Sequence, residues 1–104
     1  MNGLDRNGYA PSIMQSNTSY CFICGRTDRK LDRHEVFGAA NRQKSKALGL
    51  WVALCHRPCH LDGVHKNAAD ALILKEEAQR VAMQRYEWTK EDFIKQIGKS
   101  YVED

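Results

Sequence analysis

The pattern of apolar and polar side chains predicts two strands that flank a polar segment. Residues 31–37 mix apolar and polar positions, as a short strand does. Residues 50–54 are apolar and include an aromatic and a β-branched side chain, which is typical of a buried strand. Residues 38–49 are polar and basic and are bounded by glycines, which predicts a loop with a short helical turn near residues 43–48.

After the second strand the pattern becomes helical. Residues 68–86 are rich in strong helix formers, and Asn67 is suited to cap their start. Four apolar side chains share one stripe of this helix: Ala71, Leu74, Ala78 and Val81. A second helix is expected over residues 90–97, because Thr89 and Asp92 resemble a capping box at its start.

The order of these elements predicts a small domain of the α+β class. The chain has 104 residues, of which 42% are hydrophobic and 28% charged, as in an ordinary globular domain. Residues 1–19 are rich in Asn, Gly and Ser, which predicts a flexible or surface-laid N-terminal arm. Residues 20–104 are expected to form the domain, with the cysteines and histidines in residues 20–66 and the helices in residues 67–104.

The positive charge lies in the middle of the chain. The net charge is +3, and residues 20–65 hold eight bases against four acids. A basic segment of this kind favours a polyanionic partner such as nucleic acid, and the alternative is a solvated basic face without a partner. No apolar stretch approaches the roughly 20 residues of a membrane helix, and no secretory signal is visible, so we expect no membrane partner and a cytoplasmic location.

The four cysteines form two close pairs, Cys21 with Cys24 and Cys55 with Cys59. In a cytoplasmic protein such pairs favour a metal over disulfides, and two chelating turns can close a tetrahedral thiolate site. We therefore predict a structural Zn²⁺ on these four residues. The alternatives are an incomplete site with a merely buried cysteine, or His56 in place of one sulfur.

Three of the four histidines, His34, His60 and His65, form a second set of candidate ligands. Neutral imidazoles from a strand and from the segment after the second strand are suited to a more open divalent cation. The five-residue spacing of His60 and His65 suits a regular helix poorly, which predicts a turn or a late helix start at Gly63. Phosphodiester hydrolysis needs a cation and a general base, and His34 and Glu35 are the candidate bases, unless Glu35 is a plain strand residue.

Six short segments together resemble the HNH nucleases, and more narrowly the small HNH proteins of bacteriophages and prophages. They are Cys21-x-x-Cys24, His34-Glu35-Val36-Phe37-Gly38, Asn41-Arg42, Leu54-Cys55, Cys59-His60, and Asp62-Gly63 before Val64-His65. The resemblance covers residues 21–66 and, more loosely, the C-terminal helices. It implies a ββα-metal unit with a zinc-thiolate knuckle, followed by C-terminal helices. It also implies a DNA endonuclease or nickase that uses Mg²⁺, Mn²⁺ or another divalent cation, in the cytoplasm of a bacterial host if the protein is phage encoded.

The resemblance assigns His60 and His65 as cation ligands and leaves two interpretations of the first strand. In one, His34 is a ligand and Glu35 is the general base. In the other, His34 is the base, and Asp32 or Glu35 is the ligand.

The middle Asn of the family has no counterpart, because the aligned positions hold Leu50 and Trp51. Either Asn41 supplies this amide from the loop, or catalysis is lost. In the latter case the protein is a zinc-stapled module that binds nucleic acid or a protein. A third interpretation is a single zinc site with mixed Cys and His ligands.

Five bases are the predicted phosphate contacts to DNA. They are Arg42, Lys44 and Lys46 in the loop and Arg57 and Lys66 nearer the cation. Contacts of this kind position a duplex and carry little sequence information, so weak sequence specificity is expected.

Overall fold

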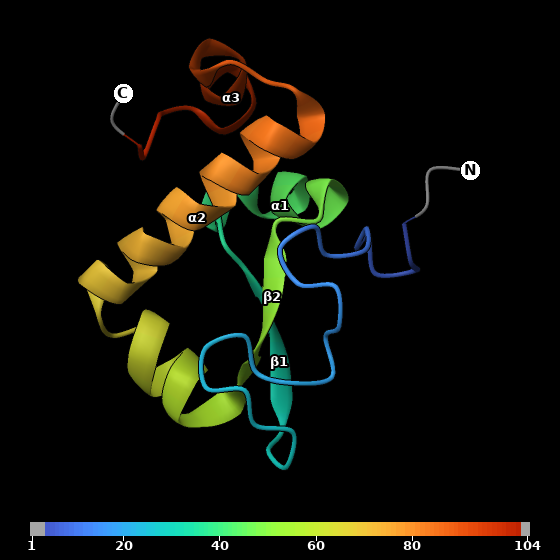
Figure 1. Ribbon diagram of the computed structural model, residues 1–104, viewed down its shortest axis with the longest axis vertical. Coiled ribbons are helices and arrows are strands. Elements are labelled where there is room, and N and C mark those ends of the chain that lie inside the picture. Colours follow the sequence, from blue (N-terminus) through green and yellow to red (C-terminus); the bar gives the residue numbers. More distant parts are fainter. Residues whose placement is uncertain (1–3, 103–104) are drawn as a thin grey trace.

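Two antiparallel strands form the centre of the fold in the computed structural model, which describes residues 4–102 (Figure 1). Strand β1 (Leu31–Glu35) pairs with β2 (Trp51–Cys55), so that His34 lies opposite Val52. The other elements are the 3-10 turn η1 (Ala39–Asn41), α1 (Arg42–Leu48), the π-helical segment η2 (His56–Val64), α2 (Ala68–Tyr86) and α3 (Lys90–Ile97). The predicted α+β class is confirmed. Residues 1–3 of the predicted arm and residues 103–104 of the predicted domain lie outside the described residues.

The predicted loop between the strands contains a complete helix, α1. Its sequence of Arg, Gln, Lys, Ser, Ala and Leu favours a helix at nearly every position. The helix ends at Gly49, which has a left-handed φ of 76°. A Cβ atom at this position would lie 2.4 Å from the carbonyl oxygen of Pro11, so both the turn and the neighbouring arm require glycine.

The two predicted C-terminal helices are confirmed with their caps. The side chain of Asn67 accepts hydrogen bonds from the backbone N–H groups of Ala69 and Asp70 at the start of α2. At the start of α3, Thr89 and Asp92 form the reciprocal capping box. In Figure 1, α2 crosses the sheet, and α3 folds back beside its C-terminal end. None of the helices in residues 4–102 has the length and apolar character needed to cross a membrane.

The N-terminal arm covers the edge of β2 that does not pair with β1. The backbone N–H of Ala53 donates to the side chain of Gln15 at 2.9 Å, and its carbonyl accepts from Phe22 N at 2.8 Å. The indole N–H of Trp51 donates to the carbonyl oxygen of Ala10 at 2.8 Å. All of β2 is buried, and Ala53 on its outer edge bonds to Gln15 of the arm and to Phe22 rather than to another strand.

Candidate metal centres

The four cysteines gather at the end of the hairpin, with all Sγ atoms within 4.8 Å of one another. All four are free thiols, and Cys24 Sγ lies 3.9 Å from Cys55 Sγ. A tetrahedral Zn²⁺ with Zn–S bonds of about 2.3 Å places its sulfurs about 3.8 Å apart. The four side chains therefore fit a metal ion such as zinc. No sulfur points away, and His56 lies instead against Asp32, with His56 Nδ1 2.7 Å from Asp32 Oδ2.

Two separate elements present these sulfurs. Cys21 and Cys24 lie on a turn that is closed by a hydrogen bond of 2.8 Å from Gly25 N to Cys21 O. Gly25 has a left-handed φ of 77°, as the sequence pattern of a knuckle requires. Cys55 ends β2, and Cys59 lies four positions later in η2, beyond Arg57, whose φ of −140° and ψ of 143° are not helical. Residues 21–25 are called the knuckle turn below.

Backbone N–H groups prepare one thiol of the cluster for metal binding. Burial raises the pKa of the Cys21 thiol, but N–H groups of Cys24, Cys55 and Ile23 donate to it and lower the pKa to about 6. The Cys24 N–H lies 3.4 Å from Cys21 Sγ. Burial and the neighbouring sulfurs raise the pKa of Cys59 instead. The cluster thus holds one ready thiolate and retains protons that a metal would displace.

The three predicted histidine ligands also come together, in a cavity of about 360 Å³. Their donor nitrogens lie within 4.8 Å of one another, and His60 Nε2 is 2.9 Å from His65 Nε2. Two nitrogens bound to one tetrahedral cation at about 2.05 Å are separated by about 3.3 Å, so a bound cation would replace this hydrogen-bond contact after a small separation of the two rings. The cavity is lined by Arg33, His34, Glu35, Gly38, Arg42, His60 and His65.

The π-helical geometry of η2 explains how His60 and His65 meet. The backbone N–H of His65 donates to the carbonyl oxygen of His60 at 3.2 Å, which is a hydrogen bond across five residues. The wide turn places the two imidazoles above one another, where an α-helix would turn them apart. The prediction for Gly63 was a turn or a late helix start. Gly63 lies inside η2, its carbonyl oxygen accepts from Lys66 N at 3.0 Å and Asn67 N at 2.8 Å, and the next helix, α2, starts only at Ala68.

Asp32 orients the imidazole of His60. Asp32 Oδ2 lies 2.8 Å from His60 Nδ1 and accepts a hydrogen bond from it in the tautomer that leaves Nε2, 2.9 Å from His65 Nε2, free to bind a cation. The same oxygen also accepts from His56. Burial raises the pKa of Asp32, but the two histidine hydrogen bonds outweigh this effect and lower it. Asp32 therefore supports a ligand and does not itself face the cluster.

His34 is held in its neutral form. Burial, together with the nearby charges of His60 and His65, lowers its pKa to about 4. A neutral imidazole is the form that binds cations, whereas a group with such a low pKa is a weak general base at neutral pH.

Glu35 lines the histidine cavity, but both of its carboxylate oxygens are engaged. Arg42 Nε donates to Glu35 Oε1 at 2.8 Å, and the Tyr9 hydroxyl donates to Oε2. The Glu35 side chain is only 10% exposed. Burial and the contact with Glu35 raise the pKa of Tyr9 to about 12, so its phenol keeps its proton. Tyr9 gave no signal in the sequence, because it belongs to an arm without periodicity.

All five predicted DNA contacts have partners within the protein. Arg42 lines the histidine cavity, whereas Lys44 donates to the carbonyl oxygen of Gln96 in the last turn of α3. Lys46 lies over the ring of Tyr9, 4.9 Å from its centroid. Arg57 and Lys66 both approach Asp62, at 2.6 Å and 3.8 Å. Arg33, which the sequence analysis did not select, joins Arg42 at the cavity.

The side chain of Asn41 does not supply the missing amide. Its Nδ2 donates to the carbonyl oxygen of Ile97 at 2.7 Å and so ties η1 to the end of α3. Leu50 is fully buried, and Trp51 donates to the arm. The residues that line the histidine cavity include no amide side chain.

Comparisons of the chain with protein-family models, with curated proteins and with solved structures found no match. The fold and the cysteine cluster define a small α+β domain suited to metal binding, and its function is argued from the sites themselves.

Proposed function

We propose that the protein is a metal-dependent DNA endonuclease or nickase of the HNH type, with its site at His34, His60 and His65. The observation that carries the proposal is the convergence of three imidazoles in one cavity that also presents two guanidinium groups. The hairpin β1–β2 followed by η2 supplies the ligands, as the ββα-metal arrangement does. The cysteine cluster joins the knuckle turn to the end of the same hairpin and is assigned to structural Zn²⁺.

The three histidines would hold a divalent cation, which supplies a Lewis acid for the charge on the phosphate and on the leaving oxygen. Their donors are nitrogens only, and this favours a softer cation such as Zn²⁺ over Mg²⁺. Asp32 fixes the tautomer of His60, and burial keeps His34 neutral. These contacts support a role for His34 as a ligand, which is the first of the two interpretations of the strand.

Glu35 is the proposed general base, and Arg42 controls its availability. In the resting protein Arg42 pairs with Glu35 Oε1. A phosphate group in the cavity attracts Arg42 and leaves this oxygen free to take a proton from the attacking water. The water oxygen then bonds to phosphorus, and the bond from phosphorus to the leaving oxygen breaks.

The test is nicking of supercoiled plasmid with Mg²⁺, Mn²⁺, Co²⁺ or Zn²⁺ by the zinc-loaded protein. We expect metal-dependent nicking that is lost in His34→Ala and strongly reduced in Glu35→Gln. Arg29→Ala removes an exposed base outside the cavity and serves as the control, with nicking close to wild type. Circular dichroism and zinc content establish that each variant is folded. Full nicking by His34→Ala would place the activity elsewhere.

A second candidate is a zinc-stapled module that binds nucleic acid or a protein without catalysis. The absence of an amide side chain from the cavity lining and the paired state of Glu35 favour it. Such a module binds one tight Zn²⁺ and does not nick with any cation. A mixed Cys and His site is disfavoured, because the two clusters share no residue.

A further inference from the structure

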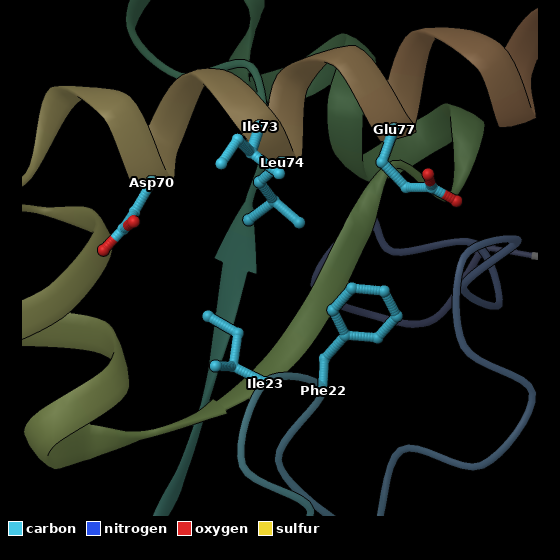
Figure 2. A pocket seen from close by; sticks show the side chains of 6 residues that line it. All are labelled: Phe22, Ile23, Asp70, Ile73, Leu74 and Glu77. Atoms are coloured by element: carbon cyan, nitrogen blue, oxygen red, sulfur yellow. The ribbon is translucent and has the colours of Figure 1, made fainter.

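An apolar groove of about 480 Å³ lies between the knuckle turn and α2, away from the histidine cavity. Figure 2 shows Phe22 and Ile23 of the knuckle turn on one wall and Ile73 and Leu74 of α2 on the other. Leu74 is buried, whereas Ile73 is 64% exposed and Ile23 is 53% exposed. Two large aliphatic side chains therefore face each other across the groove and remain in water.

Two acidic side chains stand at the ends of this groove. Asp70 and Glu77 lie at opposite ends in Figure 2 and belong to the same stripe of α2 as Ile73 and Leu74. They are seven positions apart, which is about 10.5 Å along the helix axis. Within residues 4–102, no ion pair involves either carboxylate. Both negative charges are available to an incoming cation.

The charges and the openness of the groove select among its occupants. Acidic ends repel nucleic acid and anionic membranes, and a second copy that docked with the same face would bring acid against acid. A small molecule buries most of its surface in an enclosed pocket, whereas the walls of this groove are more than half exposed at Ile73 and Ile23. The groove presents side chains and not a strand edge, so it suits a helix better than an added strand.

We propose that this groove docks an amphipathic helix of another protein, with two apolar side chains that fill the groove. Lys or Arg residues seven positions apart on that helix would reach Asp70 and Glu77. The spacing follows because a helix packed along α2 repeats the separation of the two carboxylates. The docking does not depend on the hydrolytic activity proposed above.

Two synthetic helical peptides of about 18 residues test the proposal by fluorescence anisotropy. One carries Leu at positions i+3 and i+4 between Lys residues at i and i+7, and the other has Glu in place of both Lys. We expect the Lys peptide to bind at least about tenfold more tightly. The net charge of the protein is +3, so non-specific attraction favours the Glu peptide, and a preference for Lys must come from local acids.

Variants locate the binding. Ile73→Ser is expected to weaken the Lys peptide at least about fivefold, whereas Leu72→Ser, an exposed neighbour outside the groove, leaves it unchanged. The double variant D70N/E77Q should remove the preference for Lys, and D70K/E77K should reverse it. Equal affinity for both peptides, an unaffected Ile73→Ser variant, or no binding at about 1 mM protein would overturn the proposal.

Discussion

Replacement of Asp32 by Asn is expected to weaken the histidine cation site without loss of the fold. The carboxylate lies 2.8 Å from His60 Nδ1 and 2.7 Å from His56 Nδ1, and both hydrogen bonds go to the same oxygen. An amide oxygen has no charge to strengthen these bonds, so each histidine keeps only a weaker, neutral acceptor. The tautomer of His60 is then fixed less firmly.

The magnitude follows from the position of Asp32 behind a ligand. Loss of such an outer carboxylate typically lowers metal affinity about 10- to 100-fold, or roughly 1.4–2.7 kcal/mol. The side chains of His60 and Asp32 are 14% and 19% exposed, so water screens their contact only in part. The cysteine cluster is expected to keep its metal, because Asp32 does not contact it.

The assay is calorimetric titration of Co²⁺ into protein that already carries Zn²⁺ on its cysteines. Asp62→Asn is the matched control, because Asp62 is also an acid near η2 histidines but pairs with Arg57 rather than with an imidazole. We expect a loss of affinity in Asp32→Asn alone. An unchanged affinity, or an equal loss in both variants, would refute the assigned role of Asp32.

Three further predictions address the remainder of the structure. Cys24→Ser removes one of the four gathered sulfurs and should lower the zinc content of the protein. It should also lower the free energy of unfolding by several kcal/mol, which corresponds to a fall in melting temperature of roughly ten degrees or more. An unchanged melting curve contradicts a structural metal. Gly49→Ala should lower the free energy of unfolding, measured in urea, by about 2 kcal/mol or more. The φ of Gly49 is 76°, and the added Cβ would collide with the carbonyl oxygen of Pro11 in the arm. A neutral effect would contradict the packing of the arm. Tyr9 should ionise with a pKa of about 12. Its ionisation is followed as the difference in tyrosinate absorbance between wild type and Tyr9→Phe during a pH titration. Glu35→Gln should move the pKa of Tyr9 towards its ordinary value of 10. Between about pH 10 and 12 the phenol of Tyr9 keeps its proton in the folded state and loses it in the unfolded state. Its contribution to the free energy of unfolding is therefore complete below pH 10 and is lost as the pH rises to 12. A wild-type Tyr9 that ionised at pH 10 would argue against the contact with Glu35.

Local patterns in the sequence predicted much of the scaffold. The caps at Asn67 and Thr89 and the stripe of α2 depend on neighbours within a few residues, which periodicity can detect. The spacing of the cysteines likewise predicted one cluster, because each pair lies on its own turn. The wide turn of η2 was missed although the five-residue spacing of His60 and His65 pointed to it.

Contacts between distant segments could not be predicted in the same way. Tyr9 meets Glu35 across 26 residues, and Asn41 meets the end of α3 across 56. No periodic pattern links such pairs, because they depend on how the arm and α3 fold over the hairpin. The sequence did contain a signal for Asp32 as a residue that supports the histidine site. Residues two apart on a strand lie on the same face, and Asp32 therefore lies on the same face as His34.

The most direct test of the proposed hydrolase compares plasmid nicking with occupancy of the histidine site. The nicking rate is measured against the concentration of the supporting cation in wild type, His60→Ala and Asp32→Asn, alongside calorimetric binding. The account predicts that half-maximal nicking coincides with the dissociation constant of the histidine site, moves with it in Asp32→Asn, and disappears in His60→Ala. Nicking that persists in His60→Ala, or that follows a different cation concentration, would contradict a catalytic role for this site.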